Sequence, residues 1–194
     1  MFRFSWSAVS KTTTYESVGR SGFLTLSNVF VIFFVLLAGV TVAASSVFAT
    51  TIVALGTSQT RGKGVARGDD FPAQLETLLR AKGLNVNVVN AGKNGETTKH
   101  MAKRLKKVLT PDTVLVILQP GSNDARKGQG DRTEENVEKI QQKLKKRGIK
   151  TLVVPSSFIR SFPTGRDGLH LSAEGYRQLA VALLPRVLGL LGQN

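Results

Sequence analysis

After residue 50, hydrophobic residues follow two patterns that alternate along the chain. Short runs of apolar and β-branched residues, typical of buried strands, alternate with longer segments in which apolar residues recur every three to four positions, as in amphipathic helices. The predicted strands span residues 51–55, 85–89, 113–118 and 150–154. The predicted helices span residues 71–82, a segment ending near residue 109, 133–147 and 173–191.

This alternation of strands and helices predicts an α/β domain with three layers, in which helices cover both faces of a parallel sheet of about four to five strands. Residues 113–118 are apolar on both faces, as expected of a central parallel strand. Asp70 and Ser172 are expected to cap helices, and Pro185 is expected to kink the last helix. The loops that follow the four strands would share one edge of such a sheet, so their polar residues would converge there.

The first 49 residues have a different composition. Residues 1–22 carry three basic residues and one acidic residue, and residues 23–49 carry no charge. A basic segment, an apolar segment and small residues before Ala49 predict a secretory signal that is cleaved after Ala49. An uncleaved membrane anchor formed by residues 23–49 is the alternative. In both cases residues 50–194 are expected to be an exported domain, periplasmic or secreted.

The exported domain is strongly basic. The chain has 27 Lys and Arg residues and 13 Asp and Glu residues, of which residues 1–49 hold three basic residues and one acidic residue. The exported domain therefore has 24 basic and 12 acidic residues and a net charge near +12. Such a charge attracts anionic membrane surfaces or envelope polymers. The clusters at 103–107 and 143–147 have a simpler explanation, since basic residues at helix ends complement the helix dipole on a solvated face. No aromatic residues are interleaved with them, so nucleic acid is not an expected partner.

Candidate chemistry lies at the predicted strand ends. Ser58 follows the first strand, where open α/β sheets place reactive groups, although a serine there can also simply cap a helix. Asp167 stands three residues before His170 and can orient its imidazole, although a capping Asp beside a half-buried His is the simpler alternative. His100 is expected to be a surface residue. The chain has no cysteine, and its two histidines are far apart, so no metal site is expected.

Four motifs occur in order, each after a predicted strand. They are Gly56-Thr57-Ser58-Gln59-Thr60, the Asn90–Thr97 loop with Gly95, Gly121-Ser122-Asn123-Asp124, and Asp167-Gly168-Leu169-His170. In this set of motifs the chain resembles the SGNH (GDSL) hydrolase family, and the resemblance covers residues 50 to about 180. It implies a compact flavodoxin-like SGNH fold and an enzyme that needs no cofactor and no metal.

The resemblance also implies a role for each motif residue. Ser58 would be the nucleophile, His170 the general base and Asp167 the residue that orients the histidine. The backbone N–H groups of Ser58 and Gly95 and the side-chain amide of Asn123 would form the oxyanion hole. A glycine at position 95 would keep a Cβ out of the way of the approaching oxyanion.

These roles predict an exported serine esterase that hydrolyses acyl esters or thioesters, including lysophospholipids, through an acyl-enzyme intermediate. A polysaccharide or peptidoglycan O-deacetylase with the same triad is one alternative. A non-catalytic basic module that binds anionic envelope polymers is another, although such a module has no reason to keep the five motif residues.

The chain departs from the family pattern at two positions beside the nucleophile. Thr57 replaces the common Asp and Gln59 the common Leu, so altered support of this loop is expected, with activity retained. Asp124 is expected to brace its loop. Only 42 residues separate Asp124 from Asp167, which predicts a missing strand and a more open site.

Three cations follow the nucleophile motif. Arg61, Lys63 and Arg67 are candidates to hold an anionic group of the substrate, and a solvated loop is the alternative.

Overall fold

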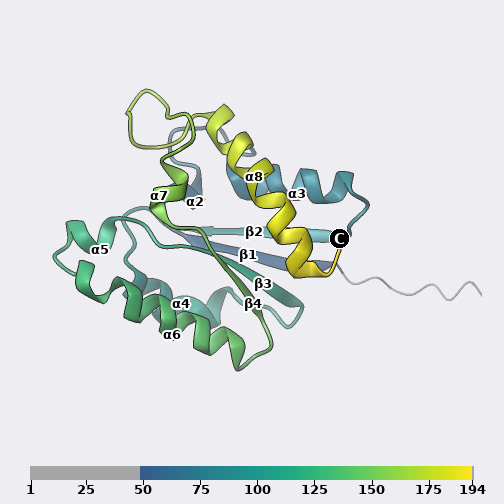
Figure 1. The fold of residues 1–194 in the computed structure, drawn as a ribbon, viewed down its shortest axis with the longest axis horizontal. Helices are drawn as coiled ribbons and strands as arrows, with labels where there is room; N and C mark the ends of the chain where they lie inside the picture. The colour runs from purple at the N-terminus through teal and green to yellow at the C-terminus, as the bar shows by residue number, and fades with distance from the viewer. Residues whose placement is uncertain (1–48, 194) are drawn as a thin grey trace, which may run out of the picture. The chain divides into compact units, whose positions relative to one another are not determined.

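The computed structural model describes residues 49–193, and in that part of the chain it contains one four-stranded parallel sheet with the strand order β2-β1-β3-β4 (Figure 1). The strands are β1 (Thr50–Gly56), β2 (Val86–Gly92), β3 (Thr113–Gln119) and β4 (Lys150–Val153). The long helices are α3 (Phe71–Ala81), α4 (Thr98–Val108), α6 (Thr133–Lys145) and α8 (Ala173–Leu191). The short ones are α2 (Ser58–Arg61), α5 (Asn123–Arg126), the 3-10 turn η1 (Gly130–Arg132) and α7 (Ser156–Ile159).

Strand β1 lies in the middle of the sheet and contributes to both hydrophobic cores. Successive side chains of a strand point to opposite faces, so Ile52 and Ala54 pack in the core with α3 and α8. Val53 and Leu55 pack in the other core with α4 and α6. Figure 1 shows these two helix pairs on opposite faces of the sheet. The predicted three-layer α/β/α fold is therefore confirmed.

The predicted helix ends match the structure closely. The carboxylate of Asp70 accepts a hydrogen bond from the Ala73 N–H at 3.2 Å, and the hydroxyl of Ser172 accepts one from the Gly175 N–H at 3.1 Å. Each side chain satisfies a donor that the first helical turn leaves free. Helix α8 is assigned without interruption through Pro185.

Strand β2 is longer than predicted, because Asn90–Gly92 continues the strand where a loop was expected. Gly56 pairs with Gly92 at the ends of β1 and β2. A Cβ at Gly92 would lie 2.2 Å from the backbone nitrogen of Arg61, so glycine allows α2 to pack directly on the strand end. The expectation of a loop beginning at Asn90 was wrong because the strand pairing continues as far as this close contact.

The carboxyl edge of the sheet carries the short helices α2, α5 and α7, which begin in segments predicted as loops or turns. Within residues 49–193 no fifth strand follows β4, in agreement with the short spacing between Asp124 and Asp167. The segment between α7 and α8 makes a single antiparallel bridge, Thr164 with Leu171. The loop that carries Asp167 and His170 is therefore not anchored by a strand of the sheet.

The predicted signal lies almost entirely outside the described residues, since the structure describes the chain from Ala49 onward. Among the helices of residues 49–193, none is both long and apolar enough to cross a membrane.

Candidate active site

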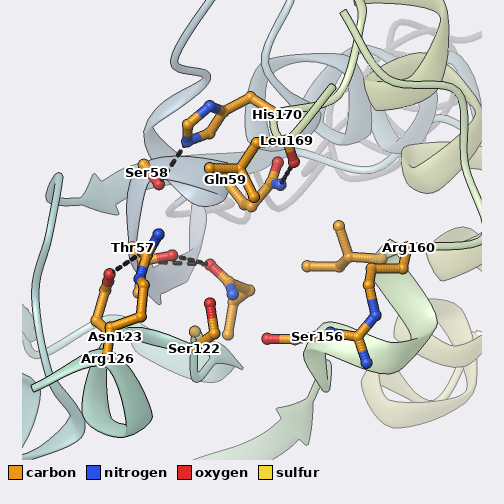
Figure 2. Close-up of a pocket in the computed structure, with 13 residues that line it drawn as sticks. Thr57, Ser58, Gln59, Ser122, Asn123, Arg126, Ser156, Arg160, Leu169 and His170 are labelled. Atoms are coloured by element: carbon orange, nitrogen blue, oxygen red, sulfur yellow. Dashed lines mark hydrogen bonds between the residues drawn. The ribbon is translucent and has the colours of Figure 1, made fainter. Parts of the chain in front are cut away.

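Ser58 lies at the carboxyl end of the central strand, as its motif position predicted. It is the first residue of α2, it is only 9% exposed, and its Oγ lies 2.9 Å from Nε2 of His170 (Figure 2). These two residues are 112 positions apart in the sequence. The fold therefore places the serine hydroxyl within hydrogen-bond reach of a base.

Asp167 completes a chain of hydrogen bonds. Its Oδ2 lies 2.6 Å from Nδ1 of His170, and its Oδ1 accepts the backbone N–H groups of Leu169 at 3.0 Å and His170 at 2.8 Å. The bond to the His170 ring, followed by the two backbone bonds, lowers the pKa of Asp167. The ionised carboxylate can only accept, so Nδ1 carries the proton and Nε2 is left to accept from Ser58. His170 is buried, whereas the Asp167 side chain is 47% exposed.

Gln59 connects two segments of the site. One is the turn at Thr57–Thr60 that carries Ser58, the nucleophile turn, and the other is the loop between α7 and α8 that carries Asp167 and His170, the histidine loop. Its Nε2 donates to the Leu169 carbonyl at 2.8 Å, and its Oε1 accepts from the Leu171 N–H at 3.3 Å and the Tyr176 hydroxyl at 3.0 Å. Burial, followed by the charges of Asp167 and Asp70, raises the pKa of Tyr176, so its hydroxyl remains a donor. A leucine at position 59 could make none of these bonds. The replacement of the common Leu by Gln59 thus introduces a hydrogen-bonded connection between the two loops that the sequence alone did not identify.

Gln119, the last residue of β3, holds the nucleophile turn in place through hydrogen bonds. Its buried Oε1 accepts from the Thr57 N–H at 3.1 Å, the Thr57 hydroxyl at 2.9 Å and the Thr60 hydroxyl at 3.1 Å. Thr57 stands where the family commonly has Asp, and a carboxylate there could not donate to this oxygen. Gln119 was missed in the sequence because its partners lie about 60 residues away.

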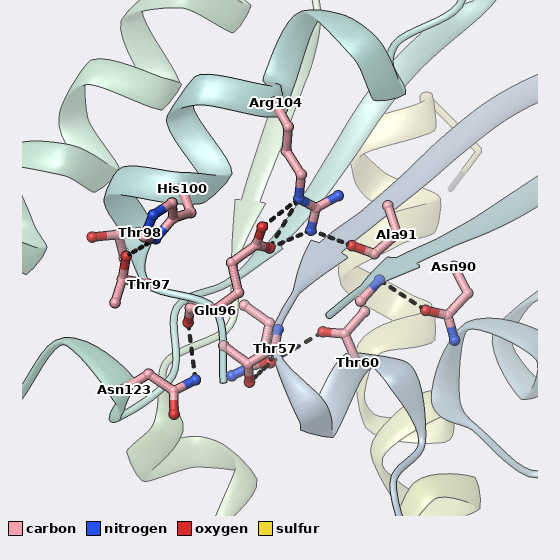
Figure 3. A network of polar contacts seen from close by, with 12 residues as sticks. Thr57, Thr60, Asn90, Ala91, Glu96, Thr97, Thr98, His100, Arg104 and Asn123 are labelled. Carbon is pink, nitrogen blue, oxygen red and sulfur yellow. Dashed lines mark hydrogen bonds and ion pairs between the residues drawn. The ribbon is translucent and has the colours of Figure 1, made fainter. Parts of the chain in front are cut away.

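Asn123 lies beside Ser58 with a fixed amide orientation. Its Nδ2 donates to the Glu96 carbonyl at 2.9 Å, and its Oδ1 accepts from the guanidinium of Arg126 (Figures 2 and 3). A guanidinium can only donate, so the amide oxygen must face Arg126. An amide nitrogen has two donors, and here one N–H remains for a ligand.

The structure places Gly95 differently from the expected picture. Gly95 is exposed, it does not line the pocket beside Ser58, and its carbonyl accepts from Lys127 at 2.8 Å. Its φ is +68°, and a Cβ there would meet no atom within 4 Å. Glycine is favoured here by the left-handed backbone conformation, and the expected clearance for an oxyanion stays a prediction.

The loop that carries Gly95 is fixed by a buried ion pair. Arg104 donates its Nε to Glu96 at 2.7 Å and its NH2 to the Ala91 carbonyl at 2.6 Å (Figure 3). Its side chain is 11% exposed and that of Glu96 is 8% exposed. The expectation that Arg104 is a solvated helix-end cation was wrong, because the helix pattern alone could not show the facing carboxylate.

Asp124 and His100 have the expected environments. Asp124 is buried and accepts from the backbone N–H and the hydroxyl of Thr98, at 3.0 and 2.6 Å, so it braces the start of α4. His100 is exposed and its Nδ1 lies 2.8 Å from the hydroxyl of Thr97. Among residues 49–193, no three His, Asp or Glu side chains gather in a way that could hold a metal ion.

A small polar pocket opens beside Ser58, between α5 and α7. Its cavity volume is about 70 Å³, and Ser58, Asn123 and His170 are among its lining residues. Arg61 and Lys63, the predicted substrate-binding cations, are exposed and do not line this pocket. The pocket instead contains two arginines that the sequence analysis did not single out, Arg126 and Arg160 (Figure 2).

Comparison with known proteins agrees with this architecture and with these motifs. Residues 54–167, more than half of the chain, match the GDSL-like Lipase/Acylhydrolase family. The chain therefore belongs to this family of hydrolases.

Individual relatives agree with this assignment. The chain is similar to Esterase TesA of Pseudomonas aeruginosa, with 28% identity over 108 residues, 55% of this chain and 54% of the relative. It thus spans about half the length of this curated relative. Among solved structures, it is similar to AlinE4, an SGNH-hydrolase family esterase, with 29% identity, a TM-score of 0.51 and coverage of 73% and 74% of the two chains. A crystal structure of TesA, at 21% identity, supports the fold with a TM-score of 0.63 and coverage of 73% and 99%.

Proposed function

We propose that the chain is a serine esterase that hydrolyses acyl esters through a Ser58–His170–Asp167 triad. The observation that carries the proposal is the continuous hydrogen-bond chain from the Ser58 hydroxyl through the imidazole to the Asp167 carboxylate. Membership of a family of lipases and acylhydrolases supports the same reaction class.

In the first half of the reaction, Ser58 Oγ attacks the carbonyl carbon of the ester while His170 Nε2 takes the hydroxyl proton. The carbonyl oxygen becomes an oxyanion. When the tetrahedral intermediate collapses, the bond to the alcohol oxygen breaks and His170 returns its proton to that oxygen. The products are a free alcohol and an acyl group on Ser58. A water molecule then repeats the sequence, and the carboxylic acid leaves.

The oxyanion needs donors that are in place before the reaction. The remaining N–H of Asn123 and the backbone N–H of Ser58 support this role, since neither is used by another hydrogen bond within residues 49–193. Gly95 is proposed as the third donor from its motif position. The neighbouring Glu96 carbonyl bonds the Asn123 amide, which supports a place for this loop beside the site.

The size of the pocket favours a short acyl group. The pocket beside Ser58 has a cavity volume of about 70 Å³, which supports short acyl groups over long acyl chains. This supports short-chain esters and, with the same chemistry, O-acetyl groups of an envelope polysaccharide, over long-chain lysophospholipids or thioesters.

The test is the hydrolysis of 4-nitrophenyl esters from acetate to laurate by the purified full-length chain. We expect the highest kcat/KM for acetate or butyrate, and a loss of at least about 10³-fold in Ser58→Ala, because the triad acts as a unit. Ser161→Ala is the matched control, since Ser161 is exposed and lies outside the pocket. Equal turnover by the Ser58 and Ser161 variants would refute the proposed mechanism.

We also propose export of residues 50–194, which is supported by the charge and hydropathy pattern of residues 1–49. Cell fractionation of the tagged chain tests this, together with the mass of the mature N-terminus. A protein confined to the cytosol would contradict export, and a mass that includes residues 23–49 would identify the anchored form.

A further inference from the structure

The pocket beside Ser58 carries positive charge and no negative charge. Arg126 and Arg160 both line it, and no Asp or Glu is among its lining residues. Only Ile159 and Leu169 contribute large apolar side chains. Beside the two guanidinium groups, a ligand that carries an anionic group would gain partners that a plain hydrocarbon group cannot supply.

The two arginines come from different elements and lie on different sides of the pocket (Figure 2). Arg126 ends α5 and uses one amino group to bond Asn123, which leaves other guanidinium donors available. Arg160 follows α7, and its guanidinium has no hydrogen-bond or ion-pair partner among residues 49–193. The hydroxyl of Ser122 is also without a partner in that part of the chain, and Figure 2 shows Ser122 between the two arginines.

Three arginines elsewhere in the domain are paired with carboxylates, and the other arginines of residues 49–193, Arg126 and Arg160 among them, are not. Arg80 pairs with Glu76 at 2.9 Å, Arg104 pairs with Glu96, and Arg177 pairs with Glu174 at 2.6 Å. No carboxylate of residues 49–193 has such a pairing with Arg126 or Arg160. Two guanidinium groups that flank one small pocket repel each other, and an anion between them would remove that repulsion.

We propose that Arg126, Arg160 and the Ser122 hydroxyl form a binding site for an anionic group carried by the ester substrate, a carboxylate or a phosphate. The proposal rests on the esterase function proposed above and adds its substrate class. Guanidinium groups bind both anions through paired N–H donors, and a hydroxyl supplies a further donor. Binding at this position would hold the substrate within reach of Ser58, so the charge selects the ester and fixes its orientation.

The anion could belong to the acyl group or to the alcohol, and two substrate pairs distinguish these sources. The first pair is mono-4-nitrophenyl adipate against 4-nitrophenyl hexanoate, in which only the acyl end differs in charge. The second pair is 4-acetoxybenzoate against its methyl ester, in which the charge lies on the leaving alcohol. The quantity measured is the ratio of kcat/KM, anionic over neutral, within each pair. Comparing this ratio between variants cancels the intrinsic reactivity of the esters.

We expect Arg160→Gln to lower this ratio about three- to tenfold in one of the two pairs, the range for a charged hydrogen bond at a partly exposed site. The loss should be mainly in KM, and Arg160→Lys should recover part of it. The matched control is Arg186→Gln, because Arg186 is exposed on α8 far outside the pocket lining and should leave both ratios unchanged. Raising NaCl from 50 to 500 mM should lower the wild-type ratio in the same pair.

The outcomes separate the two proposals. Equal losses for the anionic and neutral members of both pairs in Arg160→Gln, or an equal effect of Arg186→Gln, would overturn the anion site while leaving the esterase intact. An absence of Ser58-dependent turnover on the neutral esters would instead overturn the esterase proposal itself. The pair in which the ratio falls identifies whether the substrate carries its charge on the acyl or the alcohol side.

Discussion

The two sides of the pocket differ in how completely their polar groups are bonded. On the catalytic side, Ser58, Asn123 and His170 are buried and held by hydrogen bonds from residues far away in the sequence. On the opposite side, Arg160 and Ser122 are exposed, and their side chains have no hydrogen-bond or ion-pair partner among residues 49–193. The fold therefore positions the reacting groups before a substrate binds, whereas the side chains proposed to bind the substrate are not held by hydrogen bonds to the rest of the described chain.

The largest effect is expected from a substitution of Asp167, the most exposed residue of the triad. Asp167→Asn should lower kcat about 10²–10⁴-fold, because an amide that donates to Nδ1 would favour the wrong histidine tautomer. Hydrogen bonds lower the pKa of Asp167, so the carboxylate is already ionised well below neutrality. The wild type should therefore exceed the variant throughout the range from pH 6 to pH 9. Asp131→Asn, at an exposed position, is the control. A variant within threefold of wild type would show that Asp167 does not orient His170.

The next largest effect concerns the Glu96–Arg104 ion pair, which holds the residue whose carbonyl bonds Asn123. Arg104→Met would leave the Glu96 carboxylate buried without its partner, and the free energy of unfolding should fall by about 3–5 kcal/mol. Arg177→Met breaks an ion pair whose side chains are both about half exposed, so its cost should be far smaller than that of Arg104→Met. Urea unfolding measures both values. Equal costs would mean that burial of the Glu96–Arg104 pair does not matter for stability.

The smallest effect on this side concerns the link between the two catalytic loops. Gln59→Leu removes two hydrogen bonds to the histidine loop and one to Tyr176 of α8, and kcat should fall about tenfold with little change in KM. Gln141→Leu, on the exposed face of α6, should leave both constants unchanged. An unchanged kcat in the Gln59 variant would show that the loop holds its position without this side chain.

Much of this architecture could be predicted from the sequence. Hydrophobic periodicity predicted the four strands and the four long helices, because each element carries its own pattern of burial. Motif order located Ser58, Asp167 and His170, and the structure brings these three together. The caps at Asp70 and Ser172 were predictable because a cap depends on residues only three positions away.

The partners of the site residues could not be predicted in the same way. Gln59 bonds a loop about 110 residues away, and Gln119 bonds a turn about 60 residues earlier. Such pairs depend on which strands are neighbours and on where each loop turns, and periodicity carries neither kind of information. The pocket arginines escaped notice for the same reason: Arg160 is about 100 residues from Ser58 in sequence yet lines the pocket, whereas Arg61 is near Ser58 in sequence and does not line it.

The absence of a fifth strand in residues 49–193 has a consequence for how the protein responds to heat. The Thr164–Leu171 bridge joins two residues of the histidine loop itself, and the loop is held to the domain by the Gln59 bonds and by the buried side chains of Leu171 and His170. Ser58, in contrast, follows directly on the central strand β1. A loop that is held at a few points opens at a lower free energy than a sheet that is paired along its length. On warming, this loop should detach while the secondary structure is still intact. The temperature optimum of catalysis is then set by one loop, well below the melting point of the fold, and cooling restores activity without refolding.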